Sequence, residues 1–479
     1  MSDSTNSGLT GPTGIRQRRS LPPTAAFVGT AAAFAALYLA AGAPTSLLVL
    51  FEKEWGFPAW VLTVAFAAYA IGLLVSLLIV GSLSDYLGRR PVLIASLALE
   101  LVAMLMFVFA SDITAVIVAR VVQGIATGAA TSALTASVVE LAPERFKRLG
   151  AVIGGIAPAG GLGLGALFAG LAVQFTADAD VVVFVTLSVV VALGLAVAFF
   201  SAETVGRQRG AVRSLVPRVS IPAAARAEFR ATIPVLTGAW MLAGLFLGLA
   251  PTIIRDIFGI DSGLVNGVTV FIQPGAAAVA GLLLGGVLAR RATLVGGVAV
   301  LVGAVIIVTS IGLGILPLMW VGALIGGSGF GASFSGSLRL VGPLAKPHQR
   351  AGLFAGVYLV SYLAFGVSVI IAGQLIAPLG LMTTVLAFGV AIVVVAGLGI
   401  GAQLRMQRRD VAGVAAAAAA GSAAAAAASA ATSVAAAAAG SAASAAVVGA
   451  PETAVAEGAA RSADAPRCGS TTGMAAPAA

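Results

Sequence analysis

The sequence is poor in the residues that carry most enzyme chemistry. Its 479 residues include one cysteine, Cys468, and one histidine, His348. A single cysteine excludes a disulfide within the chain, and neither residue lies in an apolar segment where it could serve a buried site. No catalytic residue, metal site or cofactor is therefore predicted. The phosphate-binding pattern G-x-x-x-x-G-K-[ST] is also missing, which argues against transport driven by ATP.

Charge is scarce as well. Only 9% of the residues are charged and 59% are hydrophobic, whereas soluble domains carry roughly 25% charged residues. A soluble chain could not bury so much apolar surface, so the sequence indicates a protein surrounded by a lipid bilayer. The net charge of +9 could suggest nucleic acid. However, the basic residues fall in short segments between apolar runs, so no nucleic-acid partner is expected.

Twelve apolar segments remain, each near the ~20 residues that a helix needs to cross a bilayer. Strands of a β-barrel would be about 10 residues long and alternating, so helices are predicted. The first segment follows a polar stretch that resembles the start of a signal peptide, but its apolar run is long enough to span the bilayer. The predicted spans are 25–50, 60–80, 91–110, 113–139, 150–173, 181–200, 232–254, 263–289, 292–312, 317–341, 350–376 and 380–402.

Lysine and arginine are distributed unevenly over the predicted loops. Loops that follow even-numbered spans carry fifteen of these residues, whereas loops that follow odd-numbered spans carry only Lys53 and Arg255. Positively charged loops stay in the cytoplasm. Both termini are therefore predicted to be cytoplasmic, in a multi-pass protein of a cell membrane of the bacterial inner-membrane type.

The longest break between spans divides the chain into two halves of six spans. A basic, glycine-containing loop between the second and third spans returns in weaker form between the eighth and ninth, where it keeps an arginine pair but has no Asp. The sequence thus predicts an all-α integral membrane protein. Its parts are a cytoplasmic N-terminal tail at 1–24, helix bundles at 25–200 and 232–402, a central cytoplasmic loop at 201–231 and a tail at 403–479.

The C-terminal tail is nearly all Ala, Gly, Ser and Val between residues 411 and 449. Membrane insertion relies on Leu, Ile, Phe and Val, so a thirteenth span is not predicted. Alanine favours helix, which makes transient helicity plausible. The tail is nevertheless expected to be disordered.

The loop between the second and third spans reads Gly81-Ser-Leu-Ser-Asp-Tyr-Leu-Gly-Arg-Arg-Pro91. It resembles the signature G-x-L-x-D-x-x-G-R-R/K of the major facilitator superfamily. The resemblance covers residues 25–402, and it implies two six-helix bundles, each a pair of inverted three-helix repeats. It also implies a conformational latch, made of Gly81, Asp85, Gly88, Arg89 and Arg90.

The expected partners of Asp85 are Arg89 or Arg90 in its own loop, or Arg145 or Arg148 in the loop after the fourth span. Charge-assisted hydrogen bonds of this kind contribute ~1.5–3 kcal/mol. The plainer alternative is a basic loop that only sets the orientation of the chain.

Arg120 lies about 10 Å deep in the fourth span at 1.5 Å per residue. An ionised group there is costly and usually faces a cavity or a partner. The run from Arg120 through Gln123-Gly124 resembles the R-x-x-Q-G motif of the superfamily's fourth helix. That resemblance implies a role for Arg120 and Gln123 in coupling protonation to substrate movement. The alternative is an arginine that reaches to the outer surface.

Glu100 lies midway along the third span, and a carboxyl at that depth is a functional candidate by default. It lies on the helix next to that of Arg120, at a depth differing by ~5 Å. One hypothesis is a switchable Glu100–Arg120 pair that breaks on protonation. The alternative is a protonated Glu100 that only joins helices by hydrogen bonding, because the third helix is peripheral in the superfamily.

The fifth span holds Pro158, Gly160 and Gly161 within a glycine-rich run. The run resembles G-P-x-x-G-G of the drug:proton antiporter branch, with Ala157 before the proline and one residue, not two, between Pro158 and the glycine pair. It is predicted either to form a hinge or simply to be a helix-packing face. The later run Ala202-Glu203-Thr204 is similar to the P-E-T run of drug exporters, without its proline.

The superfamily's helix roles imply further residues near a central substrate cavity, although packing between helices is an alternative for each of them. These residues are polar or aromatic and lie within the predicted spans. They are Tyr38, Gln123, Thr127, Trp240, Gln273, Tyr358 and Tyr362.

The predicted function is secondary active transport by alternating access, with proton-coupled export of hydrophobic or amphipathic small molecules by an antiporter. A small-molecule substrate, protons and the lipid bilayer are the expected partners, and the protein is expected to be a monomer. The alternative is a proton-linked uptake carrier for a small anionic metabolite, with Arg120 as its counter-charge. A membrane enzyme would need catalytic side chains that the spans lack. A sensor or scaffold would need charged or aromatic contact residues in the tail.

Overall fold

The computed structural model describes residues 21–217 and 219–447, and these contain no strand. Twelve of the helical segments are long and apolar enough to cross a membrane, which confirms the predicted fold class. The spans of the first half are α1–α2 (Pro23–Gly42 and Pro44–Trp55), α3 (Ala59–Val80), α5 (Arg89–Val108), α6 (Ile113–Glu140), α7 (Lys147–Phe175) and α8 (Ala179–Phe200). Those of the second half are α10 (Arg226–Asp256), α11 (Gly263–Leu283), α12 (Ala289–Leu313), α13 (Leu316–Val341), α14 (Arg350–Leu379) and α15 (Leu381–Val447).

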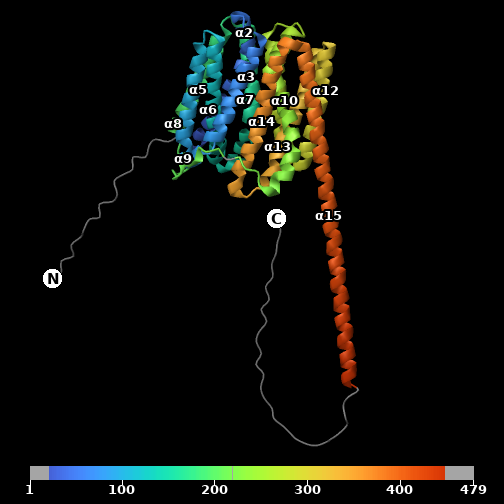
Figure 1. The fold of residues 1–479 in the computed structure, drawn as a ribbon. Helices are drawn as coiled ribbons and strands as arrows, with labels where there is room; N and C mark the ends of the chain where they lie inside the picture. The colour runs from blue at the N-terminus through green and yellow to red at the C-terminus, as the bar shows by residue number, and fades with distance from the viewer. Residues whose placement is uncertain (1–20, 218, 448–479) are drawn as a thin grey trace, which may run out of the picture. The chain divides into compact units, whose positions relative to one another are not determined.

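Short helices occupy the connections between the spans. Two of them are α-helical, α4 (Leu83–Leu87) and α9 (Ala211–Ser214). The others are single 3₁₀ turns: η1 (Glu144–Phe146), η2 (Ala223–Ala225), η3 (Leu284–Gly286), η4 (Gly342–Leu344) and η5 (Pro347–Gln349). Most loops are therefore only a few residues long, so consecutive spans run in opposite directions (Figure 1). Some consecutive spans pack directly on one another, such as α5 with α6 and α12 with α13.

The first span differs from the prediction because it is longer and broken. It begins at Pro23, and α1 gives way to α2 at Ala43–Pro44. Pro44 has no amide hydrogen, so the carbonyl of Ala40, four residues earlier, loses its helical donor. This free carbonyl lies inside the first half, where it is used by a functional side chain.

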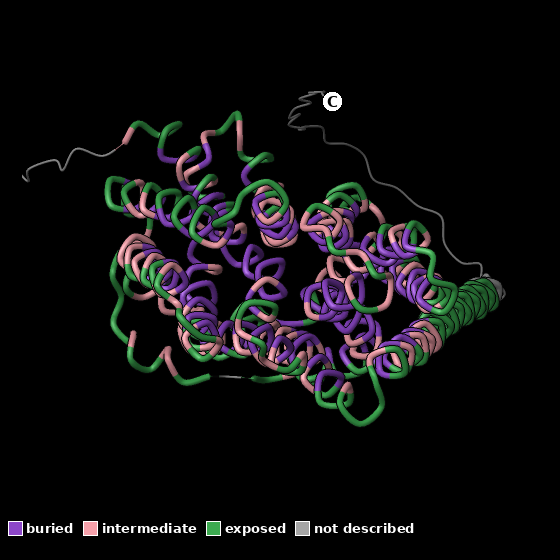
Figure 2. Tube along the Cα trace, turned by 90° about the horizontal axis from the view of Figure 1, so that it is seen from above, coloured by how far each residue is buried: buried purple, intermediate pink, exposed green. Residues whose placement is uncertain are grey.

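Residues on the side of each helix toward the interior of its half are buried, and those on the outside are mostly exposed or half-buried (Figure 2). The exposed ones include large apolar residues in the middle of spans, such as Leu193 of α8 and Ile371 of α14. Such surface suits acyl chains rather than water, as the composition indicates.

The two halves meet along two helix pairs, α7 with α11 and α3 with α14. In the first pair the contact is nearly bare backbone: a Cβ added to Gly170 would lie 2.6 Å from the Cα of Gly267. In the second pair, Phe66 and Phe365 meet edge to face with ring centroids 4.8 Å apart. In the first pair, small residues such as Gly170 and Gly267 allow the close approach between helices in a membrane.

The central loop follows the end of the molecule that carries the basic loops, here called the inner face; the opposite end is the outer face. At one point the carbonyl of Ser214 accepts a hydrogen bond from the Ser82 hydroxyl beside α4, at 3.2 Å. Further along, the Ser220 amide donates to the carbonyl of Gly352 at the start of α14. The loop is thus bonded to both halves.

Residues Met1–Arg409 form one compact unit and Asp410–Ala479 a second. The second unit is helical as far as Val447, and its described side chains are exposed. This differs from the disorder predicted for 403–479. Alanine has the highest helix propensity and long runs of it sustain a helix without tertiary contacts. The predicted N-terminal tail at 1–24 and the stretch after Val447 lie largely or wholly outside the described residues.

Candidate functional site

Arg120 of α6 is buried in the first half, with 1% of its surface exposed. Its Nη1 donates to the carbonyl of Ala41 at 3.0 Å and to Oε1 of Gln123 at 2.7 Å. Its guanidinium also lies over the ring of Tyr69, 4.5 Å from the centroid. The structure therefore places Arg120 inward rather than at the outer surface, with carbonyl dipoles and an aromatic face around its charge.

Gln123 lies one turn further along α6, between Arg120 and Glu100. Its Nε2 donates to the carbonyl of Ala40 at 3.0 Å and to Oε1 of Glu100 at 3.2 Å. The Ala40 carbonyl is the one that Pro44 leaves without a helical donor, so the break in the first span creates an acceptor for this amide. Gln123 thus joins the third, fourth and first spans.

Glu100 of α5 is fully buried, and its second oxygen, Oε2, has no partner among the described residues. The hydroxyl of Tyr69 is likewise buried without a partner. The hypothesis of a direct Glu100–Arg120 pair needs correction, because no such ion pair occurs in the described part of the chain and Gln123 lies between the two. Arg120 turns toward α1 and α3 rather than toward α5, which sequence depth alone could not indicate.

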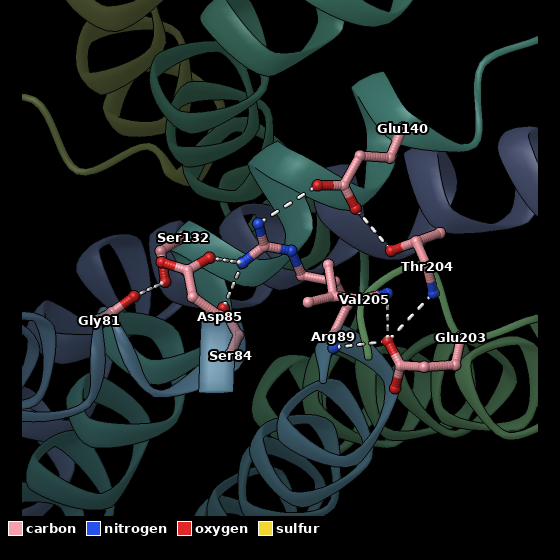
Figure 3. A network of polar contacts seen from close by, with 9 residues as sticks. All are labelled: Gly81, Ser84, Asp85, Arg89, Ser132, Glu140, Glu203, Thr204 and Val205. Atoms are coloured by element: carbon pink, nitrogen blue, oxygen red, sulfur yellow. Dashed lines mark hydrogen bonds and ion pairs between the residues drawn. The ribbon is translucent and has the colours of Figure 1, made fainter. Parts of the chain in front are cut away.

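Three of the predicted latch residues, Gly81, Asp85 and Arg89, lie in a polar network on the inner face (Figure 3). Nη1 of Arg89 contacts Asp85 at 2.5 Å and the Ser84 hydroxyl at 2.7 Å, while Nη2 lies 3.2 Å from Glu140 at the end of α6. Of the partners expected for Asp85, the structure supplies Arg89; Arg145 and Arg148 form no ion pair with it. Glu140, which joins the network to α6 and to the Thr204 hydroxyl, was missed as a partner.

Glu203, after α8, caps the start of α5. Its carboxylate accepts hydrogen bonds from the main-chain amides of Arg89 at 2.7 Å and Arg90 at 3.1 Å, and also from those of Thr204 and Val205. The amides of Arg89 and Arg90 belong to the first turn of α5, where donors lack helical partners and the dipole favours an anion. The run Ala202-Glu203-Thr204 hence ties the sixth span to the loop between the second and third.

The remaining latch residues have different neighbours. Gly81 accepts a hydrogen bond from the Ser132 hydroxyl of α6 through its carbonyl, at 2.6 Å. Gly88 has φ 99° and ψ 154°, a conformation that is essentially restricted to glycine. Arg90 turns away from Asp85: it donates to the carbonyl of Phe199 and stacks on the ring of the same residue.

The second half contains a counterpart of this network at the weaker copy of the loop. Arg290 pairs with Glu228 of α10 at 2.7 Å and lies 3.2 Å from Oε1 of Gln403, whose amide reaches the Thr232 hydroxyl. The copy has no Asp in its loop, and a carboxylate from another helix supplies the negative charge. Both halves thus hold an inner-face arginine by a carboxylate.

Polar contacts join the halves on the outer face. Arg255 at the end of α10 pairs with Glu52 of α2 at 2.6 Å, and both side chains are mostly shielded, with 20% and 11% of their surface exposed. Lys53 and Asp261 form a second, exposed pair across the same boundary. The Ser262 hydroxyl also contacts Gln174 of α7 at 2.8 Å. The structure is closed at this face.

Aromatic side chains gather where the second half meets the first. Trp240 of α10 contacts Phe330 and Phe334 of α13 and Tyr362 and Phe365 of α14, with centroid distances of 4.9–5.5 Å. Tyr358 lies 6.4 Å from Tyr362. These six residues are called the aromatic cluster below.

The aromatic cluster brings together three of the residues predicted for the substrate cavity. Tyr362 also packs against the cluster of Ala41, Tyr69 and Leu73 in the first half, and the Nε1 donor of Trp240 is buried without a partner. The other four predicted cavity residues lie on neighbouring helices. Gln123 bonds to Arg120 and Glu100 as described above, and the hydroxyl of buried Thr127 donates to the carbonyl of Gln123 at 2.9 Å. Tyr38 bonds to Thr131 at 2.9 Å, and Gln273 of α11 is buried with its Nε2 unpaired. Phe330, Phe334 and Phe365 were not singled out from the sequence, because phenylalanine occurs in most of the predicted spans.

A family model of the Major Facilitator Superfamily matches residues 26–369. The chain belongs to the major facilitator superfamily. It is accordingly a transporter and not an enzyme. No curated protein matches it. In the described part of the chain, no group of three or more His, Cys, Asp or Glu side chains lies close enough to hold a metal ion.

Solved structures with the same fold include two of a peptide transporter, POT. A mutant of it in complex with alafosfalin has a TM-score of 0.65 and 14% sequence identity, and covers 81% of this chain and 95% of that one. The same mutant without the named ligand has a TM-score of 0.63 at 15% identity. A POT family transporter in complex with 5-aminolevulinic acid has a TM-score of 0.60 at 14% identity, covering 78% and 93% of the two chains. At such identities the likeness concerns the fold alone.

In this major facilitator transporter, the glycine-rich part of α7 packs on both halves. The helix continues unbroken through Pro158. A Cβ on Gly161 would lie 2.5 Å from the Cβ of Tyr38, and one on Gly160 would lie 3.7 Å from Ala278 of α11. The residues predicted as a hinge therefore serve as a packing face in this state, and the drug:proton antiporter branch stays a prediction.

Proposed function

We propose that this transporter exports hydrophobic or amphipathic small molecules in exchange for protons, by alternating access. The aromatic cluster carries the proposal. Its six residues offer large apolar faces, tyrosine hydroxyls and an unpaired indole donor between the two halves, without a formal charge. Such a surface suits a mostly apolar ligand with a few polar groups.

The chain Arg120–Gln123–Glu100 is the proposed coupling element. Glu100 has one oxygen bonded to Gln123 and one without a partner, so protonation changes what its carboxyl can accept or donate. A change at Glu100 reaches Arg120 through the side-chain amide of Gln123, and Arg120 contacts α1 and α3 directly. Protonation would in this way alter the packing of the first half around its central helices.

Alternating access then requires the outer face to open. The Glu52–Arg255 and Lys53–Asp261 pairs would break, together with the Ser262–Gln174 contact. The inner face would close in turn, with Asp85 and Arg89 positioned on the first half as a latch. In the structure those two residues bond to each other, and 58% of the Asp85 side chain is exposed, so Asp85 is accessible to an approaching group.

Proton-linked uptake of a small anionic metabolite is the second candidate, and buried Arg120 is the observation that favours it. Structures of the same fold hold alafosfalin and 5-aminolevulinic acid. Against this candidate, Nε and Nη1 of Arg120 already donate to Ala41, Gln123 and, at 3.4 Å, Ala65. An anion that bound these donors would have to displace the three acceptors.

The setting that we propose is a cell inner membrane, with a monomeric protein and both termini in the cytoplasm. The Lys and Arg distribution supports this orientation. Reporter domains fused after Gly206 and after Arg409 test it, and both should report the cytoplasm. The second position avoids Gln403, which is buried.

Substrate-dependent proton flux in inside-out vesicles, measured against a panel of compounds, tests the function. We expect amphipathic aromatic compounds to release protons from acidified vesicles and small anionic metabolites to have no effect. Trp240→Ala should abolish the response, whereas Trp60→Ala, an exposed tryptophan on α3, should preserve it. A response to anions alone would establish the second candidate instead.

A further inference from the structure

A cavity of about 550 Å³ lies on the outside of the first half, at the inner face. It is formed where α5 begins, where α8 ends and where the central loop departs. Its lining is mainly apolar, with Leu87, Pro91 and Phe199 among the walls. Arg90 and Arg207 supply its basic groups. No residue of this cavity belongs to the aromatic cluster or to the hydrogen-bonded group of Arg120, Gln123 and Glu100.

The charge of Arg90 has no carboxylate partner in the described part of the chain. One of its Nη atoms donates to the Phe199 carbonyl and its guanidinium lies 5.4 Å from the centroid of the Phe199 ring, while its Nε is buried and unpaired. Arg207 is exposed at the same cavity. A cation held in this way has capacity for an anionic ligand, since its present contacts are a carbonyl and a ring.

Glu203 also lines the cavity, but its negative charge is already satisfied. Its carboxylate accepts four main-chain amides, two of them at the start of α5. It is thus committed to capping the helix and does not pair with Arg90 or Arg207. The basic side chains exceed the acidic one, and the cavity carries a net positive charge.

The cavity lies at the end of two membrane spans, where lipid headgroups meet water. Its wall continues onto exposed apolar side chains of the membrane-facing surface, such as Phe199 and Leu87. Basic pockets at the cytoplasmic side of membrane helices suit the headgroups of anionic lipids. We propose that this cavity binds one anionic phospholipid, with its phosphate at Arg90 and Arg207 and an acyl chain along Phe199 and Ile94.

Such a lipid would contact the same elements that hold the latch. Arg90 follows Arg89 directly, and the amides of both bond to Glu203. An occupied site therefore fastens the start of α5 to the end of α8, and a membrane poor in anionic lipid would leave this junction looser. The proposal concerns binding and does not depend on the identity of the transported compound.

Native mass spectrometry of the detergent-solubilised full chain tests the site, with added phosphatidylglycerol or phosphatidylcholine. We expect one phosphatidylglycerol to bind in preference to phosphatidylcholine. Replacing Arg90→Gln and Arg207→Gln together should lower that preference by about fivefold per arginine, the factor that corresponds to the ~1 kcal/mol expected of each basic residue. Val205→Trp, which fills the cavity without changing charge, should also lower it.

The matched control is Arg145→Gln with Arg148→Gln, which removes the same charge from exposed positions of the inner face outside the cavity. This control should bind phosphatidylglycerol as the unaltered chain does. Equal losses in both double variants would show a diffuse attraction and overturn the site. The site would also be overturned if Val205→Trp kept the preference for phosphatidylglycerol. The same holds if millimolar inorganic phosphate fully displaced phosphatidylglycerol, because the acyl chain would then contribute nothing to binding.

Discussion

Gly88 leaves the space that the Glu203 carboxylate occupies. A Cβ on Gly88 would lie 2.8 Å from Cδ of Glu203 and closer still to Oε2. The backbone of Gly88 also has φ 99°, which brings the amides of Arg89 and Arg90 toward that carboxylate. The glycine of the loop signature and the acid after the sixth span thus form one structural unit.

Gly88→Ala should disrupt this unit. The added methyl displaces Glu203, and the backbone conformation costs about 1–3 kcal/mol for a residue other than glycine. We expect a lower midpoint of thermal unfolding and a several-fold lower transport rate. Gly155→Ala is the control, because a Cβ there meets no atom within 4 Å. Equal midpoints for the two variants would contradict the interpretation.

Arg120→Gln should reduce both stability and transport. The carbonyl of Ala41 and Oε1 of Gln123 lose a charged donor in a buried setting, at about 1–3 kcal/mol for each unsatisfied group. Arg120→Lys keeps the charge but lacks the planar fork that reaches both acceptors. We expect the lysine variant to fold better than the glutamine variant and still to transport poorly. Normal proton flux in the lysine variant would limit the role of Arg120 to its charge.

Glu100→Gln tests proton coupling. Glutamine preserves the size of the side chain and can still bond to Gln123, so folding and downhill exchange should survive. Accumulation against a gradient should be lost, together with the dependence of the rate on pH. A variant that still accumulates substrate with normal pH dependence would show that Glu100 only joins α5 to α6.

The Glu52–Arg255 pair should stabilise the state that is closed at the outer face. Arg255→Gln leaves Glu52, which is largely shielded from water, without its partner, and the equilibrium should shift toward outer-face opening. Spin labels at Arg145→Cys and Lys346→Cys in a Cys468→Ser background report the inner-face separation. We expect shorter distances between the two labels in Arg255→Gln than in the labelled protein that keeps Arg255. Lys53→Gln, which breaks the exposed pair, should change them far less.

The membrane helices could be predicted from the sequence, because apolar run length determines them. The direction in which each side chain points could not. Arg120 and Glu100 are close in depth, yet Gln123 lies between them. Its position three residues after Arg120 placed it on the same face of α6, which was the available signal.

Contacts between distant segments were beyond the reach of the sequence. Asp85 and Arg89 are four residues apart, and their pairing was one of the alternatives predicted. Glu140 approaches the same loop from α6 and Glu203 from the segment after α8, and neither was predicted as a partner. The loop charges were used only to orient the chain, so Glu52 and Arg255 were not recognised as a pair. Which acid meets which base depends on how the helices pack, and hydropathy carries no information on that.

The central loop sets a mechanical limit on transport. It is bonded to the first half at Ser214 and to the second at Ser220, and these points are six positions apart along the chain. An extended chain covers at most ~3.6 Å per residue, so the tether reaches about 22 Å when taut. While both ends stay docked, the inner mouth can widen no further than this tether allows. The size of the largest molecule that can pass is consequently limited by the length of this loop, even if the molecule does not contact the loop.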